Sequence, residues 1–186
     1  MMTKLAQSFV ILSAVASIGL ASTTAFGLAY TTALAEKVKE SGSFDVAYVK
    51  KDAQPIPDQD GHMLLLTESS GTSANQGGLV DGFSVSVREI ADLRQGTGAH
   101  QGYVIYSKGS DQEVVKFDGM VTTTMKDGKP NTAMKGKYSV VSATGALAGI
   151  KGEGTYSGYF TAEDKYHVDW EGSRSGAKEA KADSKK

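Results

Sequence analysis

Residues 113–171 read EVVKFDGMVTTTMKDGKPNTAMKGKYSVVSATGALAGIKGEGTYSGYFTAEDKYHVDWE, and this stretch decides the fold. Its four alternating segments are joined by two tight turns, at 127–130 and 162–165, and by a glycine-spaced hinge at 144–154. Strands that follow one another with short links form an antiparallel meander, and a meander of this length has to close or cover its edges. We therefore expect a closed barrel.

The chain before this stretch shows the same period of two, in which bulky and polar side chains alternate. Further strands are predicted at 44–49, 62–68, 83–88 and 102–107. The segments 50–61, with its two prolines, and 69–78, rich in Ser, Gly, Thr and Asn, are predicted to be loops, the second one exposed and mobile. A bulge or a bend is expected at 89–92, where the alternation is broken. The pattern thus predicts an all-β, antiparallel up-and-down β-barrel of about eight strands.

Residues 1–35 have the three parts of a secretory signal peptide. Lys4 supplies a positive charge, Phe9–Leu20 is apolar, and Ala33-Leu34-Ala35 is a small-x-small cleavage pattern, with Ala25 as a second possible cleavage site. The strongly apolar run covers roughly a dozen residues, whereas spanning a bilayer takes about 20. A membrane anchor is the alternative, but we expect cleavage, export to the periplasm or the outside, and no stable membrane insertion afterwards.

The remaining chain is predicted to form one β-barrel domain, 36–172, followed by a disordered Lys-rich tail, 173–186. The tail contains no apolar residue larger than alanine, so it cannot bury enough surface to offset its ordering entropy. The sequence contains no cysteine, which excludes disulfides, thiol chemistry and a cysteine-linked lipid anchor. The domain therefore depends on a single hydrophobic core.

Charge and motifs exclude several classes of function. Residues 36–172 carry 14 basic and 19 acidic residues, which argues against a nucleic-acid partner. The histidines, His62, His100 and His167, fall on separate segments without paired spacing, so no metal site is predicted. The sequence contains no Gly-x-Ser-x-Gly elbow, and its Gly-x-Gly pairs precede no predicted helix. We therefore predict no catalytic residue and no cofactor.

Arg88 and Glu89 are two charged residues that could line a cavity. Arg88 and Glu89 are adjacent, and adjacent residues lie on opposite faces of a regular strand. They could form an inward polar pair only if a bulge turned one of them, so exposure is the simpler expectation. His167 alternates with the bulky residues of the last strand and is expected on the outer face.

Several short stretches resemble a known group of proteins. These are 114–119 (VVKFDG), 126–130 (KDGKP), 149–156 (GIKGEGTY) and 168–172 (VDWEG). They resemble small secreted bacterial proteins of unknown function, which in turn are similar to the allene oxide cyclase-type barrel that plant dirigent proteins share. The resemblance covers roughly residues 79–172 and implies an eight-stranded barrel that confines a hydrophobic small molecule. The resemblance assigns no catalytic residue to this chain. Glu153 is the first candidate for a catalytic acid, but the glycines on both sides of it fit a structural hinge better.

The aromatic residues at alternating positions give the most specific site prediction. Six of them are expected to converge inside the barrel and to line a ligand site: Tyr103, Phe117, Tyr138, Tyr156, Phe160 and Trp170. An eight-stranded barrel has an interior that is either filled by side chains or has room for one small ligand. We expect a packed core with a modest pocket at one end.

The function predicted from the sequence is the binding of a small apolar or amphipathic molecule in or at the mouth of the barrel, without a defined reaction. Two alternatives stay open. The first is an isomerase or cyclase of the allene oxide cyclase type, and the second is a structural or interaction module of the cell envelope. The identity of the ligand and the oligomeric state are not encoded in any pattern that we recognise.

Overall fold

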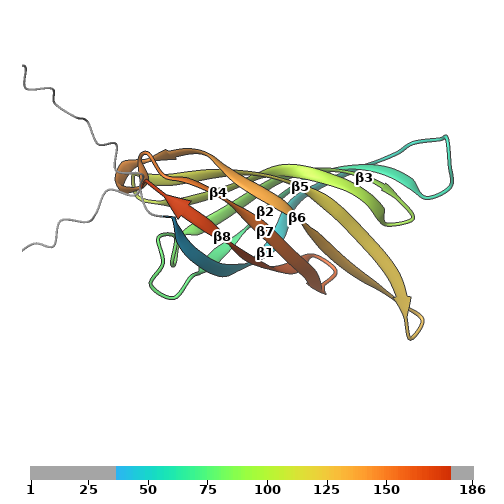
Figure 1. The fold of residues 1–186 in the computed structure, drawn as a ribbon. Helices are drawn as coiled ribbons and strands as arrows, with labels where there is room; N and C mark the ends of the chain where they lie inside the picture. Colours follow the sequence, from blue (N-terminus) through green and yellow to red (C-terminus); the bar gives the residue numbers. More distant parts are fainter. Residues whose placement is uncertain (1–36, 177–186) are drawn as a thin grey trace, which may run out of the picture. The chain divides into compact units, whose positions relative to one another are not determined.

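The computed structural model describes residues 37–176, which form eight strands and one short 3-10 helix (Figure 1). The strands are β1 (Val38–Pro55), β2 (His62–Ala74), β3 (Ser84–Arg94), β4 (Thr97–Lys108), β5 (Asp111–Lys126), β6 (Lys129–Thr144), β7 (Lys151–Ala162) and β8 (Lys165–Ser175). The helix, η1 (Gly145–Leu147), lies between β6 and β7. Within residues 37–176 no helix has the length and hydropathy needed to cross a bilayer. The predicted signal peptide, 1–35, and residues 177–186 lie outside the described residues.

Each strand pairs antiparallel with the next one in sequence, and the first strand pairs with the last. The closing contact between β1 and β8 runs from Val38 opposite Arg174 to Ala47 opposite Lys165. This ring leaves none of the eight strands with a free edge. The predicted all-β, up-and-down barrel of about eight strands is confirmed.

The core is formed by alternate residues of the strands, as the period of two requires. Val85 and Val87 of β3 and Val168 and Trp170 of β8 are buried, and the residues between them are more exposed. Because inward-facing side chains from the whole ring meet along the axis, one continuous core fills most of the barrel.

Glycines opposite the aromatic residues make room for their rings. Gly119 of β5 faces Gly136 of β6, and the hydroxyl of Tyr156 on β7 lies against both. A Cβ on Gly136 would come within 2.5 Å of that hydroxyl. Tyr138 of β6 lies in the same way over a glycine pair of β7 and β8. The alternation of glycine and aromatic residues in β7 is therefore a packing device, as its pattern indicated.

One end of the barrel is covered by chain segments. Leu147 in η1 and Ile150 after it are buried in the core, so the predicted hinge at 144–154 also serves as a cover. Val80, in the connection between β2 and β3, is fully buried at the same end. The N–H of Ala146 donates to the Asp111 carboxylate at 2.9 Å, which fixes this cover to the start of β5.

Three local predictions are wrong. Residues 50–55 belong to β1, because Pro55 is its last residue and its missing N–H interrupts no ladder. Residues 69–74 belong to β2, where small side chains such as Ser69 and Ser73 fit a crowded interior. The bulge at 89–92 does not occur, since β3 pairs without a register shift on both sides. Register shifts occur instead between β1 and β2, between β5 and β6, and between β7 and β8.

The boundary between barrel and tail also needs correction. Ser173, Arg174 and Ser175 continue β8 and pair with β7. Arg174 is only 4% exposed, and its charge is paired inside the barrel with the fully buried Glu113 and the partly buried Glu40. Composition alone did not reveal this, since the acidic partners lie on β1 and β5.

Candidate functional site

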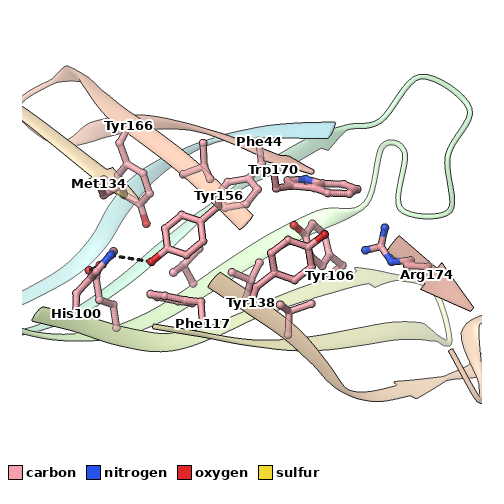
Figure 2. Close-up of a pocket in the computed structure, with 15 residues that line it drawn as sticks. Phe44, His100, Tyr106, Phe117, Met134, Tyr138, Tyr156, Tyr166, Trp170 and Arg174 are labelled. Carbon is pink, nitrogen blue, oxygen red and sulfur yellow. Dashed lines mark hydrogen bonds and ion pairs between the residues drawn. The ribbon is translucent and has the colours of Figure 1, made fainter. Parts of the chain in front are cut away.

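The interior of the barrel contains a cavity of about 50 Å³. Its lining comes from strands all around the barrel except β2, and Figure 2 shows the side chains. The lining residues are Phe44, Val87, Glu89, His100, Val104, Tyr106, Val115, Phe117, Met134, Tyr138, Tyr156, Tyr166, Val168, Trp170 and Arg174. Most are apolar or aromatic and a few are polar, which is the usual composition of a small-molecule site.

Four of the six predicted lining residues surround this cavity: Phe117, Tyr138, Tyr156 and Trp170. Phe160 is inside the barrel but outside the lining, and packs with its ring centroid 5.6 Å from that of Tyr166. The prediction for Tyr103 is wrong, because this side chain is 45% exposed on the outer wall. Both faces of β4 carry β-forming residues, so alternation alone did not show which face is inside.

Polar groups of the lining are joined in a chain of hydrogen bonds. The Glu89 carboxylate lies 2.7 Å from Nδ1 of His100, and Nε2 of His100 lies 2.8 Å from the hydroxyl of Tyr156 (Figure 2). The other Glu89 oxygen accepts a bond from the Thr67 hydroxyl at 3.2 Å. The His100 side chain is only 2% exposed, so these contacts take place away from solvent.

The carboxylate fixes the roles of the two imidazole nitrogens. Because a carboxylate oxygen can only accept, Nδ1 of His100 carries a hydrogen and donates a hydrogen bond to Glu89. Nε2 then accepts a hydrogen bond from the hydroxyl of Tyr156. Burial raises the pKa of Tyr156, and the charges of Glu89 and Asp118 raise it further, so the phenol is neutral.

Phe117 holds this chain in place by ring contacts. Its ring centroid lies 5.5 Å from that of His100 and 5.7 Å from that of Tyr156, both in edge-to-face geometry. Such contacts contribute about 0.5–1.5 kcal/mol beyond burial. The imidazole and the phenol therefore have defined orientations at the cavity wall.

A second polar cluster lies near the covered end of the barrel. Arg174 donates to Glu113 from Nη2 at 2.6 Å and to Glu40 from Nη1, and its guanidinium lies 4.8 Å from the Trp170 ring centroid. Glu113 is fully buried, and burial raises its pKa although Arg174 opposes this. Its Oε2 has no hydrogen-bond partner among residues 37–176. The cluster therefore consists of one guanidinium, that of Arg174, between two carboxylates, those of Glu113 and Glu40.

The tyrosines of the lining remain protonated. Burial raises the pKa of Tyr138 to about 12, and it raises the pKa of Tyr106 and Tyr166 further. Their hydroxyls are therefore hydrogen-bond donors in a largely apolar wall.

Other candidate groups lie elsewhere. His62 is buried at the opposite end between Asp58 and Asp92, and its Nε2 lies 2.7 Å from Asp92. His167 is on the outer face beside Asp45 and Asp169, as its phase predicted. Within residues 37–176 no group of three His, Asp or Glu side chains is arranged to hold a metal ion.

Glu153 and Arg88 do not contribute side chains to the cavity. The Glu153 side chain is 71% exposed and pairs with Lys37 at 3.3 Å. Arg88 points outward and Glu89 inward, as expected for adjacent residues of a regular strand. The inward pair of Arg88 and Glu89 is therefore not formed, but Glu89 alone reaches the interior.

The outer wall has a separate depression, the outer groove, of about 610 Å³. It is lined by Lys50, Asp52, Leu66, Thr67, Glu68, Arg88, Glu89, Ile90, Gln101, Gly102, Tyr103 and Lys116. Leu66 and Ile90 are each nearly half exposed and face one another across β2 and β3. Charged side chains stand beside them along the same strands.

Three polar residues of the lining were not predicted as site residues from the sequence: Glu89, His100 and Arg174. Each follows the phase of its buried neighbours. Glu89 lies two residues from Val87 and from Ala91, and Arg174 lies four residues from Trp170. A polar residue at a strand position whose neighbours two or four residues away are apolar and buried was therefore the available sign that its side chain points inward.

No protein-family model matches the chain, and no curated protein matches it. Solved structures that are similar to this chain include the following three. A DUF3224-family protein of unknown function from Shewanella oneidensis MR-1 is 16% identical, with 74% of this chain and 96% of that chain covered and a TM-score of 0.41. The pterocarpan synthase dirigent proteins GePTS1 and PsPTS1 are 14% and 11% identical, over 83% and 78% of this chain and 99% and 98% of theirs, with TM-scores of 0.44 and 0.41.

The resemblance that the sequence suggested is thus matched by structural similarity to a DUF3224 protein and to dirigent proteins. At these identities and TM-scores the similarity carries no information on substrate or mechanism. The assignment of the fold rests on the strand pairing itself.

Proposed function

We propose that the barrel binds a small apolar or amphipathic molecule in its interior cavity. The observation that carries the proposal is an apolar cavity with a few polar groups placed on its wall, the tyrosine hydroxyls and the hydrogen-bonded Glu89 and His100. Apolar walls supply affinity by removing ligand surface from water, and a small number of polar groups fix its orientation.

The size of the cavity limits the ligand. A water molecule needs about 10–15 Å³ on this measure, and an apolar cavity of about 150 Å³ holds benzene. The 50 Å³ found here admits a molecule of few non-hydrogen atoms, or one end of a longer amphipathic molecule. A bulky ring system enters only if lining side chains move.

Native mass spectrometry of the protein purified from its own source tests the proposal. We expect a bound small molecule that is released on denaturation. Val115→Ile adds one methylene group to the cavity wall and should reduce the bound fraction, whereas Val141→Ile, on the exposed face of β6, should not. A protein without any bound species, or equal occupancy in both variants, contradicts ligand binding in this cavity.

We further propose that residues 1–35 direct export and are removed. The support is the order of Lys4, the apolar run and Ala33-Leu34-Ala35. The intact mass of the protein recovered from the cell envelope or the medium checks this. The expected mass is that of a chain that begins at Glu36. An uncleaved chain in the cytoplasm contradicts the proposed export and cleavage.

The outer groove favours a second candidate function, that of an interaction module. Leu66, Ile90 and Tyr103 expose apolar surface there, and exposed apolar surface is a common feature of docking sites. In this case Ile90→Asp should abolish retention of the protein in the envelope fraction and leave the interior cavity unchanged. Retention that is insensitive to Ile90→Asp counts against this candidate.

A further inference from the structure

Glu89, His100 and Tyr156 form a continuous hydrogen-bonded chain, and all three residues line the cavity. From this geometry we propose that the chain transfers protons on a bound ligand, and that the barrel isomerises a small carbonyl compound with an acidic α-proton. The inference rests on the ligand binding proposed above and adds to it a reaction and the residues that perform it.

The arrangement does more than satisfy a buried histidine. A buried imidazole needs only two partners, and backbone groups or serines are sufficient for that purpose. Here one partner is a carboxylate that is itself held by Thr67, and the other is a phenol that lines the cavity. Carboxylate, imidazole and hydroxyl in this order are the arrangement that activates a hydroxyl for proton transfer.

The chain is held rigidly before any ligand arrives. Phe117 packs edge-on against both the imidazole and the phenol. The glycine pair Gly119 and Gly136 gives the Tyr156 hydroxyl a fixed place against the backbone. Fixed geometry matters because a group that already has the productive orientation loses no further freedom in the reaction.

The proton transfer balances without a co-reactant. The Cα–H bond of the ligand breaks, its electron pair forms a C=C bond, and the carbonyl π pair moves to oxygen. The proton goes to Tyr156 Oη while Tyr156 passes its own proton to Nε2 of His100. The imidazolium that results is stabilised by Glu89, 2.7 Å away.

The second half of the reaction reverses these steps at another atom. His100 returns its proton to Tyr156, and Tyr156 delivers one to the carbonyl oxygen or, in a ligand whose C=C bond is conjugated with the enolate, to the γ-carbon. One proton leaves the ligand and one is returned, so the product is an isomer. Tyr138 lines the same cavity as a neutral phenol and is able to donate a hydrogen bond to the oxygen on which charge develops.

Exchange of α-protons for deuterium tests the inference. Straight-chain ketones from acetone to 2-hexanone serve as probes in D₂O, with ¹H NMR as the measurement. Emission of Trp170, the only tryptophan of the chain and a lining residue, reports binding separately. We expect the wild type to exchange the ketones that bind on the order of 10²–10⁴-fold faster than Tyr156→Phe does.

Matched controls are available on the outer face. Tyr159→Phe lies on the same strand as Tyr156, and His167→Gln is the counterpart of His100→Gln. Both controls should exchange at the wild-type rate. His100→Gln should lower the exchange rate by a much larger factor than the ketone affinity, a separation that loss of packing alone would not produce.

Two outcomes overturn the inference in different ways. If ketones change Trp170 emission but exchange equally fast in wild type and Tyr156→Phe, the proton-transfer role is wrong and ligand binding stands. If none of the ketones changes Trp170 emission, the proposed binding fails, and the reaction fails with it.

Discussion

Replacement of Arg174 by methionine tests the interior charge arrangement most severely. The guanidinium is 4% exposed, donates to Glu113 and Glu40, and lies over the Trp170 ring. Methionine keeps much of the apolar stem but supplies no charge. Arg174→Met therefore leaves the fully buried Glu113 without a cation.

Removal of one partner of a buried ion pair costs about 3–5 kcal/mol, because an uncompensated charge remains in a medium of low dielectric constant. For a domain of this size 1 kcal/mol corresponds to about 2–4 °C in Tm. We expect Tm to fall by roughly 6–20 °C at neutral pH. The loss should be smaller in acid, since burial raises the pKa of Glu113 and its protonation removes the charge.

Thermal unfolding followed by circular dichroism measures this effect. Lys37→Met is the matched control, because the Lys37–Glu153 pair is about 70% exposed on both sides and such pairs contribute about 0–1 kcal/mol. The double variant Arg174→Met with Glu113→Gln should regain part of the lost stability. A loss in Arg174→Met no larger than that in Lys37→Met would refute the buried ion pair.

Three further predictions concern packing and pH. Phe117→Ala should lower the free energy of unfolding by about 3–5 kcal/mol, as is usual for a buried phenylalanine. Tyr103→Ala, on the outer wall, should change it by no more than about 0.5 kcal/mol. Equal losses in chemical denaturation would show that the assignment of Phe117 to the inside and Tyr103 to the outside is wrong. Gly136→Ala should cost about 1–3 kcal/mol because its Cβ would collide with the backbone of β5, and wild-type stability would contradict this packing. Hydrogen bonds to Asp58 and Asp92 raise the pKa of His62 in the folded protein, so its contribution to stability is complete below about pH 6.5 and is lost as the pH rises through the folded-state pKa. The Tm difference between wild type and His62→Gln should therefore shrink from about pH 5 to 9. A Tm difference that does not change with pH contradicts the pairing.

The architecture could be predicted from the sequence because the period of two and the turn residues act locally. The Asp127-Gly128 turn is one example, since both residues have the positive φ that the sequence indicated. Strand ends were harder to place. Residues 69–74 have the composition of a loop but pair as a strand, because the interior at that position requires small side chains.

The site could be predicted only in part. Phe117, Tyr138, Tyr156 and Trp170 follow the inward phase, and the structure places them around the interior cavity; that they line a ligand site stays a prediction. The polar chain could not be assembled, because Glu89, His100 and Tyr156 lie on three strands and are brought together by the shear of the barrel. No spacing within a single segment contains that information.

The account depends most directly on a cavity that accepts a ligand, and titration with straight-chain alcohols measures this. Trp170 emission reports binding from within the lining. Affinity should rise by about 0.8 kcal/mol, or roughly fourfold, per added methylene until the cavity is full. The limiting chain length should be shorter in Val115→Ile and unchanged in Val141→Ile. Emission that does not saturate with any alcohol, or an identical limit in both variants, would contradict the account.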